Sequence, residues 1–209
     1  LGDIVGYGAD PNPCVEWVRE KVDITVAGNH DWAAIEKTAI THFNSYARES
    51  CFWTRKQLSQ KNKNFLQSLP LDHEEGGVYW VHASPFEPEA WHYVTSRVGA
   101  KRHFRHFQTS LCFVGHSHHP IIVEQTEDGE VNDYVSDTWE VDPKNRYIFN
   151  DGSLGQPRDG NPDPSFMLYD SARKAVSVHR FKYDLSSARN KILEVGLPPY
   201  LAERLERGR

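Results

Sequence analysis

The sequence predicts an α/β protein whose functional residues lie at the carboxyl ends of its strands. Two observations support this fold class. Short apolar runs alternate along the chain with segments of helical periodicity, and several runs stop at a glycine or a histidine followed by polar residues. In open α/β sheets, ligands bind in the crevice outside the carboxyl ends of the strands. We therefore expect the site at that edge.

The run Leu111–Val114 is the most informative of these strands. Its residues are apolar without interruption and Gly115 follows, which is typical of a buried central strand. His116 and His118 come next with one serine between them, so both can turn toward one point as the strand ends. A metal ion is the natural occupant of that point. Taken alone, the stretch is also compatible with ordinary surface histidines.

Composition bounds the class of protein. With 209 residues and 38% hydrophobic content, the chain is most simply one domain with a substantial core. The net charge of -5 argues against a protein that coats long nucleic acid, because that affinity comes mostly from basic residues, whereas a small phosphate substrate fits. Cys14, Cys51 and Cys112 form no C-x-x-C motif, which is typical of reduced thiols in a cytoplasmic protein. No apolar run is long enough to cross a membrane. The sequence begins at Leu1 and not at Met, so it leaves open whether a targeting segment precedes Leu1.

The first elements carry two groups of polar residues. Leu1–Gly8 places glycines around Asp3, as at the end of a strand, and a carboxylate on such a turn is a hard oxygen donor for a cation, although an ordinary turn is equally compatible. Pro13–Lys21 has helical character. Val22–Ala27 alternates like a strand and runs into a Gly-Asn-His-Asp sequence.

This Gly-Asn-His-Asp sequence offers three chemistries. Asn29 can coordinate a metal through its amide oxygen, and His30 can donate a proton. Asp31 can hold the ring of His30, cap the following helix, or do both.

The middle of the chain contains two further helical patterns and a strand. Trp32–Arg48 reads as one helix, and Thr54–Leu69 reads as another with Thr54 and Gln57 in capping-box spacing. The strand Gly77–Val81 ends at His82, which repeats the pattern of a strand followed by a potential ligand. Two more segments look helical, namely Glu89–Val98 and Ala100–Phe107.

The last part of the chain predicts strands and then helices. The expected elements are strands at Ile121–Gln125 and Arg146–Phe149, a turn at Asp128-Gly129 in an exposed segment Glu127–Asp142, an antiparallel pair formed by Phe166–Tyr169 and Ala175–Tyr183, and helices at Ser187–Val195 and Tyr200–Arg207.

A glycine-rich loop follows the strand Arg146–Phe149, and it contains Arg158. The guanidinium of Arg158 either makes a bidentate contact to phosphate or pins the loop through Asp151 or Asp159.

The ligands at separate strand ends form a mixed Asp, Asn and His set. Such a set suits Mn, Fe, Ni, Co or Zn, and the lack of cysteine ligands argues against a closed structural zinc site. Two ions on the order of 3.5–4 Å apart would stabilise both the attacking and the leaving oxygen of a phosphoryl displacement.

The motifs resemble those of a known family. G-D-I-V-G-Y-G, G-N-H-D, V-H-A-S, G-H-S-H and N-D-G-S-L-G-Q-P-R-D-G are similar, in this order, to the motifs of the calcineurin-like metallophosphoesterase superfamily, in its branch of small bacterial and archaeal phosphodiesterases. The resemblance implies an αββα four-layer sandwich of two mixed sheets flanked by helices, as a single domain over residues 1–209. The family's first motif, Asp-x-His, has no counterpart, so we expect the opening strand and helix to lie upstream of Leu1.

The resemblance also implies the roles of the site residues. A hydroxide bridging two divalent ions would attack phosphorus in line, and the chain as given is expected to hold at most one ion tightly. The implied roles are Asp3 bridging both ions, Asn29, His82 and His116 binding one, His118 binding the other, His30 as general acid or phosphate contact with Asp31 orienting it, and Asn29, His30 and Arg158 contacting the substrate.

The expected function is hydrolysis of a small phosphate ester by a phosphodiesterase or phosphatase. The alternative is a non-catalytic interaction scaffold on the same fold, which the survival of the histidines disfavours. A nuclease acting on long DNA is disfavoured by the acidic charge balance. The oligomeric state is left open.

Overall fold

A computed structural model describes residues 1–209, and the chain forms two compact units. The first unit comprises Leu1–Leu71 and Asp184–Arg207, and the second comprises Asp72–Tyr183 and Gly208–Arg209. The single domain that the sequence suggests over residues 1–209 therefore stays a prediction.

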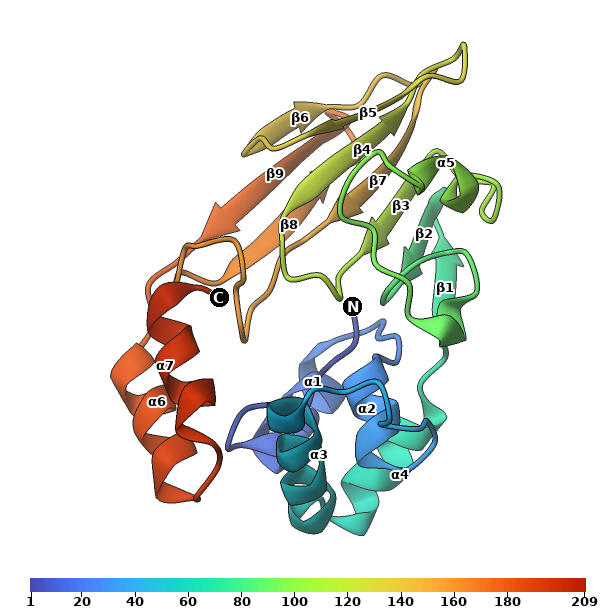
Figure 1. The fold of residues 1–209 in the computed structure, drawn as a ribbon. Helices are drawn as coiled ribbons and strands as arrows, with labels where there is room; N and C mark the ends of the chain where they lie inside the picture. Colours follow the sequence, from blue (N-terminus) through green and yellow to red (C-terminus); the bar gives the residue numbers. More distant parts are fainter. The chain divides into compact units, whose positions relative to one another are not determined.

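The first unit is helical (Figure 1). Its two C-terminal helices lie side by side and bury Ile192, Leu197, Leu201 and Leu205 in a common cluster, against which Tyr7 packs. The six helices of this unit are α1 (Pro11–Lys21), α2 (Asn29–Ala34), α3 (Ser45–Gln57), α4 (Gln60–Ser68), α6 (Leu185–Glu194) and α7 (Pro199–Arg207). The helices expected at Pro13–Lys21, Ser187–Val195 and Tyr200–Arg207 are confirmed.

The expected helix over Trp32–Arg48 is wrong. α2 ends at Ala34, and Glu36 beyond it takes a left-handed backbone conformation with φ 63°. α3 begins only at Ser45, where the side chain of Asn44 accepts a hydrogen bond from the Ala47 N–H at 2.9 Å. The intervening residues form turns, because the helical pattern in the sequence is interrupted by an N-cap that periodicity alone does not show.

The expected helix over Thr54–Leu69 is also divided. Leu58 and Ser59 are both extended, with ψ 126° and 153°, and they separate α3 from α4. The hydroxyl of Ser59 accepts a hydrogen bond from the Asn62 N–H at 3.2 Å and caps α4. Thr54 lies buried within α3, so the proposed capping box at Thr54 is wrong.

The segment Val22–Ala27 does not form the strand that its alternation predicts. A strand requires a hydrogen-bonded neighbour, and no ladder includes this segment. The Ala27 N–H instead donates to the carbonyl of Pro70 at 2.7 Å. The residues of Leu1–Gly8 are also not in a strand.

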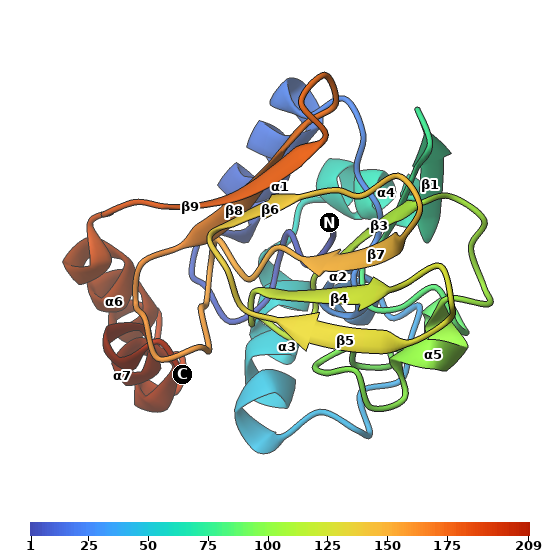
Figure 2. The same ribbon diagram turned by 90° about the horizontal axis from the view of Figure 1, so that it is seen from above.

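The second unit contains two sheets (Figure 2). The larger is mixed and has the order β1-β2-β3-β7-β4-β5, and the smaller has the order β6-β9-β8 with antiparallel pairs throughout. The strands of the larger sheet are β1 (Asp72–Glu75), β2 (Val78–Val81), β3 (Leu111–Val114), β4 (Ile121–Gln125), β5 (Val131–Tyr134) and β7 (Arg146–Asn150), and those of the smaller are β6 (Thr138–Glu140), β8 (Ser165–Asp170) and β9 (Ala175–Arg180). Two sheets together with helices confirm the predicted α/β fold class, although the smaller sheet is antiparallel and not mixed as expected.

The central strand is confirmed. All four residues of β3 are buried, and β3 pairs in parallel with β2 on one side and with β7 on the other. The carboxyl ends of these three strands therefore meet at one edge of the sheet. The cluster beneath this edge includes Val81, Val114 and Ile148, one residue from each strand.

The expected helix over Glu89–Val98 is wrong. Only a single 3-10 turn, η1 (Pro88–Ala90), forms there, and it is flanked by Glu87 and Trp91 at φ 45° and 56°. Left-handed residues on both sides prevent a continuous α-helix. The next expected helix is shorter than predicted, since α5 comprises Ala100–His103. No helix of the structure is long and apolar enough to cross a membrane.

Candidate metal centre

In the first unit, Asp3 lies against the start of α2. Asp3 has φ 53°, and its Oδ1 accepts a hydrogen bond from the His30 N–H at 2.8 Å. Gly28 approaches Asp3 so closely that a Cβ added at Gly28 would overlap the carboxylate and amide of Asp3. A Cβ at Gly2 would likewise lie 2.6 Å from Gly28 N. The two glycines are therefore needed for the contact that holds the Asp3 carboxylate.

Asp31 also connects the segment Leu1–Gly8 with the start of α2. It is fully buried, its Oδ1 accepts a hydrogen bond from Val5 N–H at 3.2 Å, and its Oδ2 accepts one from Gly28 N–H at 2.9 Å. Two backbone donors stabilise the ionised carboxylate in a buried position. Asp31 thus fixes Val5, in the segment that contains Asp3, against Gly28 at the start of α2. Its orientation of the His30 ring stays a prediction.

His30 lies between two aromatic rings. Its ring centroid is 4.5 Å from that of Tyr7 and 4.7 Å from that of Phe43. A Cβ at Gly6 would be 2.7 Å from His30 Nδ1, so the chain can pass this edge of the imidazole only as glycine. His30 and its neighbour Asn29 are each 7% exposed. The two aromatic contacts and the passage of Gly6 at the Nδ1 edge restrict the orientations that the imidazole can adopt.

In the second unit, His82 and His116 meet at the ends of β2 and β3. His82 Nε2 lies 3.2 Å from His116 Nδ1, and both side chains are buried. Each offers a ring nitrogen as a metal ligand. Two nitrogens at about 2.0–2.1 Å from one divalent ion lie about 2.8–3.4 Å apart, from the octahedral to the tetrahedral angle. The spacing of this pair therefore fits two ligands of the same ion.

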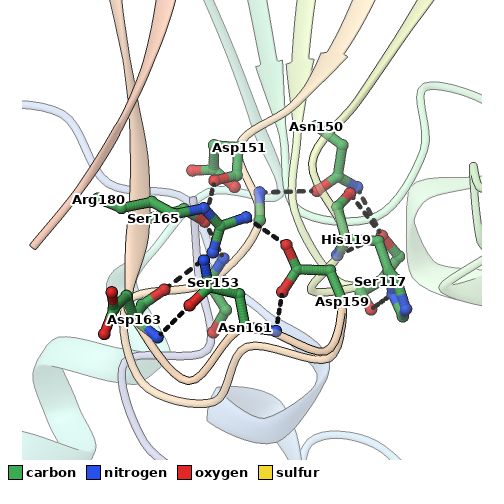
Figure 3. Close-up of polar contacts among 11 residues, drawn as sticks. Ser117, His119, Asn150, Asp151, Ser153, Asp159, Asn161, Asp163, Ser165 and Arg180 are labelled. Carbon is green, nitrogen blue, oxygen red and sulfur yellow. Dashed lines mark hydrogen bonds and ion pairs between the residues drawn. The ribbon is translucent and has the colours of Figure 1, made fainter. Parts of the chain in front are cut away.

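A buried asparagine holds the loop that follows β3. His116 and His118 have φ 63° and 61°, both left-handed, which lets alternate residues of this loop turn toward the sheet edge. Asn150, at the end of β7, donates through Nδ2 to Gly115 C=O at 2.6 Å and to Ser117 Oγ at 2.9 Å. Figure 3 shows Asn150 and Ser117 side by side. The end of β7 thereby supports two strained residues.

His118 has a defined tautomer. Its Nδ1 lies 2.6 Å from the carbonyl oxygen of Gln156. A carbonyl can only accept, so Nδ1 carries the proton and Nε2 keeps the lone pair that a metal requires. The Arg158 N–H donates to His118 C=O at 3.2 Å, while the Arg158 guanidinium donates to Gln156 Oε1 at 3.3 and 3.0 Å.

The comparisons place the chain in a family. The crystal structure of a metallophosphoesterase from Sphaerobacter thermophilus is 39% identical to this chain in sequence, with a TM-score of 0.89, over 100% of this chain and 86% of that one. The chain belongs to the calcineurin-like metallophosphoesterase superfamily. The uncharacterized protein MJ0912 of Methanocaldococcus jannaschii is 38% identical over 214 residues, covering 100% of this chain and 85% of that protein.

A more distant structure has the same fold. The hypothetical protein PH1004 from Pyrococcus horikoshii OT3 is 17% identical to this chain, with a TM-score of 0.78, over 100% of this chain and 84% of that one. No family model matches the sequence.

The sequence did not point to several residues that contact the histidines at this edge of the sheet. Tyr93 stacks on His116 with ring centroids 4.2 Å apart, and Trp91 meets His82 edge-on at 6.0 Å. Both come from the segment expected to be a helix, where no periodic signal marks them. Gln156 acts through its main-chain carbonyl, for which a sequence gives no side-chain signal.

Asp151 is a further carboxyl group at this edge. It directly follows β7, and its N–H donates to Val114 C=O at 3.1 Å. Burial raises the pKa of Asp151 to about 6, although the charge of His82 opposes the shift. The sequence indicates Asp151 and Asp159 only as ion-pair partners of Arg158. In the structure, Asp159 forms an ion pair with Arg180.

Proposed function

We propose that this metallophosphoesterase hydrolyses the ester bond of a small phosphodiester or phosphomonoester with divalent metal ions. The observation that carries the proposal is the 3.2 Å separation of His82 Nε2 and His116 Nδ1 at the ends of two parallel strands. Similarity to the Sphaerobacter metallophosphoesterase over the whole chain supports the same reaction class.

We assign the ligands in two groups. His82 and His116 bind one ion and His118 Nε2 binds a second, while Asp3 and Asn29 supply the oxygen ligands that the family motifs imply. A ligand set made only of nitrogen and oxygen atoms suits Mn, Fe, Ni, Co or Zn. When bound, two such ions lower the pKa of water enough to supply hydroxide as the nucleophile and neutralise charge on the phosphate.

The chain's own side chains then orient the ester and move a proton. His30, held between Tyr7 and Phe43, donates a proton to the leaving oxygen. The Asn29 amide and the Arg158 guanidinium bind phosphate oxygens, for which a planar guanidinium is well suited. The hydrogen bond to Gln156 Oε1 fixes this guanidinium beside Gln156, the residue whose carbonyl contacts His118.

A hydrolysis screen tests the proposal. The metal-free protein is supplied in turn with Mn²⁺, Ni²⁺, Co²⁺, Zn²⁺ or Mg²⁺ and assayed on bis(p-nitrophenyl) phosphate, p-nitrophenyl phosphate, nucleotides and cyclic nucleotides. We expect at least one ester to be hydrolysed with at least one metal, and we expect a chelator to stop the reaction.

Two histidine variants make the screen specific. His116→Ala removes one of the paired nitrogens and should lower turnover at least 100-fold, whereas His179→Ala changes an exposed histidine of β9 and should leave turnover unchanged. A folded, metal-loaded protein that hydrolyses none of these esters would favour the scaffold alternative. Wild-type turnover in His116→Ala would remove the assigned ligand.

A further inference from the structure

The loop after β7 holds His118 at two points. The Gln156 carbonyl accepts the His118 Nδ1 proton at 2.6 Å, and the Arg158 N–H donates to the His118 carbonyl at 3.2 Å. The ring and the backbone of His118 are therefore both fixed by residues of one irregular loop. A hydrogen bond of this kind to the second ring nitrogen fixes the tautomer and the orientation of a histidine ligand.

The start of the loop is fixed by serine hydroxyls. Gln156 is 4% exposed, and its N–H donates to Ser153 Oγ at 2.9 Å. Ser153 N–H donates in turn to Ser165 Oγ at 3.1 Å, and Ser165 Oγ donates to the Asp151 carbonyl at 3.0 Å. Ser165 is the first residue of β8, so this chain of hydrogen bonds attaches the loop to the smaller sheet (Figure 3).

The far side of the loop is held by Arg180, the last residue of β9. Its Nη2 forms an ion pair with Asp159 Oδ2, and its Nη1 donates to the Asp163 carbonyl at 2.9 Å. The side chains of Arg180 and Asp159 are 24% and 19% exposed, so the pair is partly shielded from solvent. Figure 3 shows the guanidinium between the two aspartates of the loop. The planar guanidinium of Arg180 thus links Asp159 to Asp163, four positions further along the chain.

We propose that the Arg180–Asp159 pair is a positioning device that sets the tautomer and the metal affinity of His118 through the loop. In the sequence, Asp159 lies one residue from Arg158 and three from Gln156, the two residues that contact His118. Loss of the pair lets the loop shift, and the Gln156 carbonyl then no longer holds the Nδ1 proton. The inference rests on the proposed function in taking His118 as a metal ligand.

The simpler reading is that the pair contributes only to stability. Exposed ion pairs contribute little to stability, and the chain offers a matched example in Arg173–Asp170 at the turn between β8 and β9. The side chains of that pair are 84% and 48% exposed, and neither residue contacts the loop's hydrogen bonds given above. Arg173→Met therefore removes an arginine from the same hairpin without touching the loop.

The first experiment reads the tautomer of His118 in the metal-free protein. Two-dimensional ¹H–¹⁵N spectra of histidine side chains at about pH 8, where an ordinary imidazole is neutral, are compared for the wild type, Arg180→Met, Asp159→Asn and Arg173→Met. We expect the Nδ1–H form in the wild type and in Arg173→Met, and a mixture of tautomers in Arg180→Met and Asp159→Asn. Arg180→Lys, which retains the charge, should restore much of the Nδ1–H form.

The second experiment titrates the same metal-free proteins with Mn²⁺ by calorimetry. Removal of a residue that orients a metal ligand costs about 10–100-fold in affinity, so we expect a loss of about tenfold for the ion bound by His118 and little change for the other ion. An unchanged tautomer in folded Arg180→Met, or an equal loss in Arg173→Met, would overturn the inference. Failure of the proposed function looks different, because the wild type would then show the Nδ1–H form and yet hydrolyse no ester.

Discussion

His30 shows how a single residue can be prepared for proton transfer by its packing. Its imidazole is 7% exposed and lies between Tyr7 and Phe43, and Gly6 passes its Nδ1 edge. The sequence motif predicted the residue and its neighbour Asn29. It could not predict the aromatic partners, because Phe43 lies in a turn that periodicity assigned to a helix.

Replacement of His30 by alanine tests its proposed role. We expect turnover to fall by about 10²–10⁴-fold, because general acid catalysis contributes about that much. Metal content should stay nearly unchanged, since His30 is not an assigned ligand. Steady-state kinetics and elemental analysis of the same preparation measure both. A variant that loses its metal or keeps wild-type turnover would contradict the role.

The lowered pKa of His103 makes the free energy of unfolding depend on pH. It is 3% exposed in α5, and burial, followed by the charge of Arg102, lowers its pKa from 6.5 to about 4. Below pH 6.5 the unfolded chain binds a proton that the folded chain does not, so stability is full above pH 6.5 and is lost as the pH falls toward 4. At 1.36 kcal/mol per pKa unit, about 2 kcal/mol is lost by pH 5.

Urea unfolding at pH 7.5 and pH 5 measures this loss. His103→Phe removes the titrating group and should flatten the dependence of unfolding free energy on pH. His179→Ala replaces an exposed histidine and should leave that dependence unchanged. The assignment is wrong if the wild type and His103→Phe lose the same stability between the two pH values.

At the scale of elements, the strands were easier to predict than the helices. Buried parallel strands such as β3 appear as unbroken apolar runs, and β2, β4 and β7 gave similar signals. The helices α3 and α4 appeared as one because a two-residue break at Leu58-Ser59 leaves the apolar spacing almost intact. Val22–Ala27 has the alternation of a strand but no neighbour to pair with in this structure.

The break between α3 and α4 carries its own prediction. Ser59→Ala removes the hydroxyl that caps α4 and should cost about 1 kcal/mol of unfolding free energy. Ser68→Ala is the matched control, because the Ser68 hydroxyl donates only to the Phe65 carbonyl at the exposed end of the same helix. Chemical denaturation compares the two variants. Equal losses, or a larger loss for Ser68→Ala, would show that Ser59 is not the cap that begins α4.

At the scale of the whole molecule, the motifs predicted the candidate site better than its supports. The order of the motifs indicated the superfamily, and the structure brings His82 and His116 together as the motifs imply. Asn150, Tyr93 and the Gln156 carbonyl hold the histidines, yet they act through buried amides, ring stacking and backbone groups. Such contacts depend on tertiary structure, so no local pattern in the sequence reveals them.

The most direct measurement of the central claim is X-ray absorption at the zinc edge of the zinc-loaded protein. The claim is that His82 and His116 bind one ion in a site without cysteine. We predict nitrogen and oxygen scatterers at about 2.0–2.2 Å, with imidazole features that decrease in His82→Ala and in His116→Ala but not in His179→Ala. A sulfur scatterer at about 2.3 Å, or imidazole features unchanged in both ligand variants, would contradict the claim.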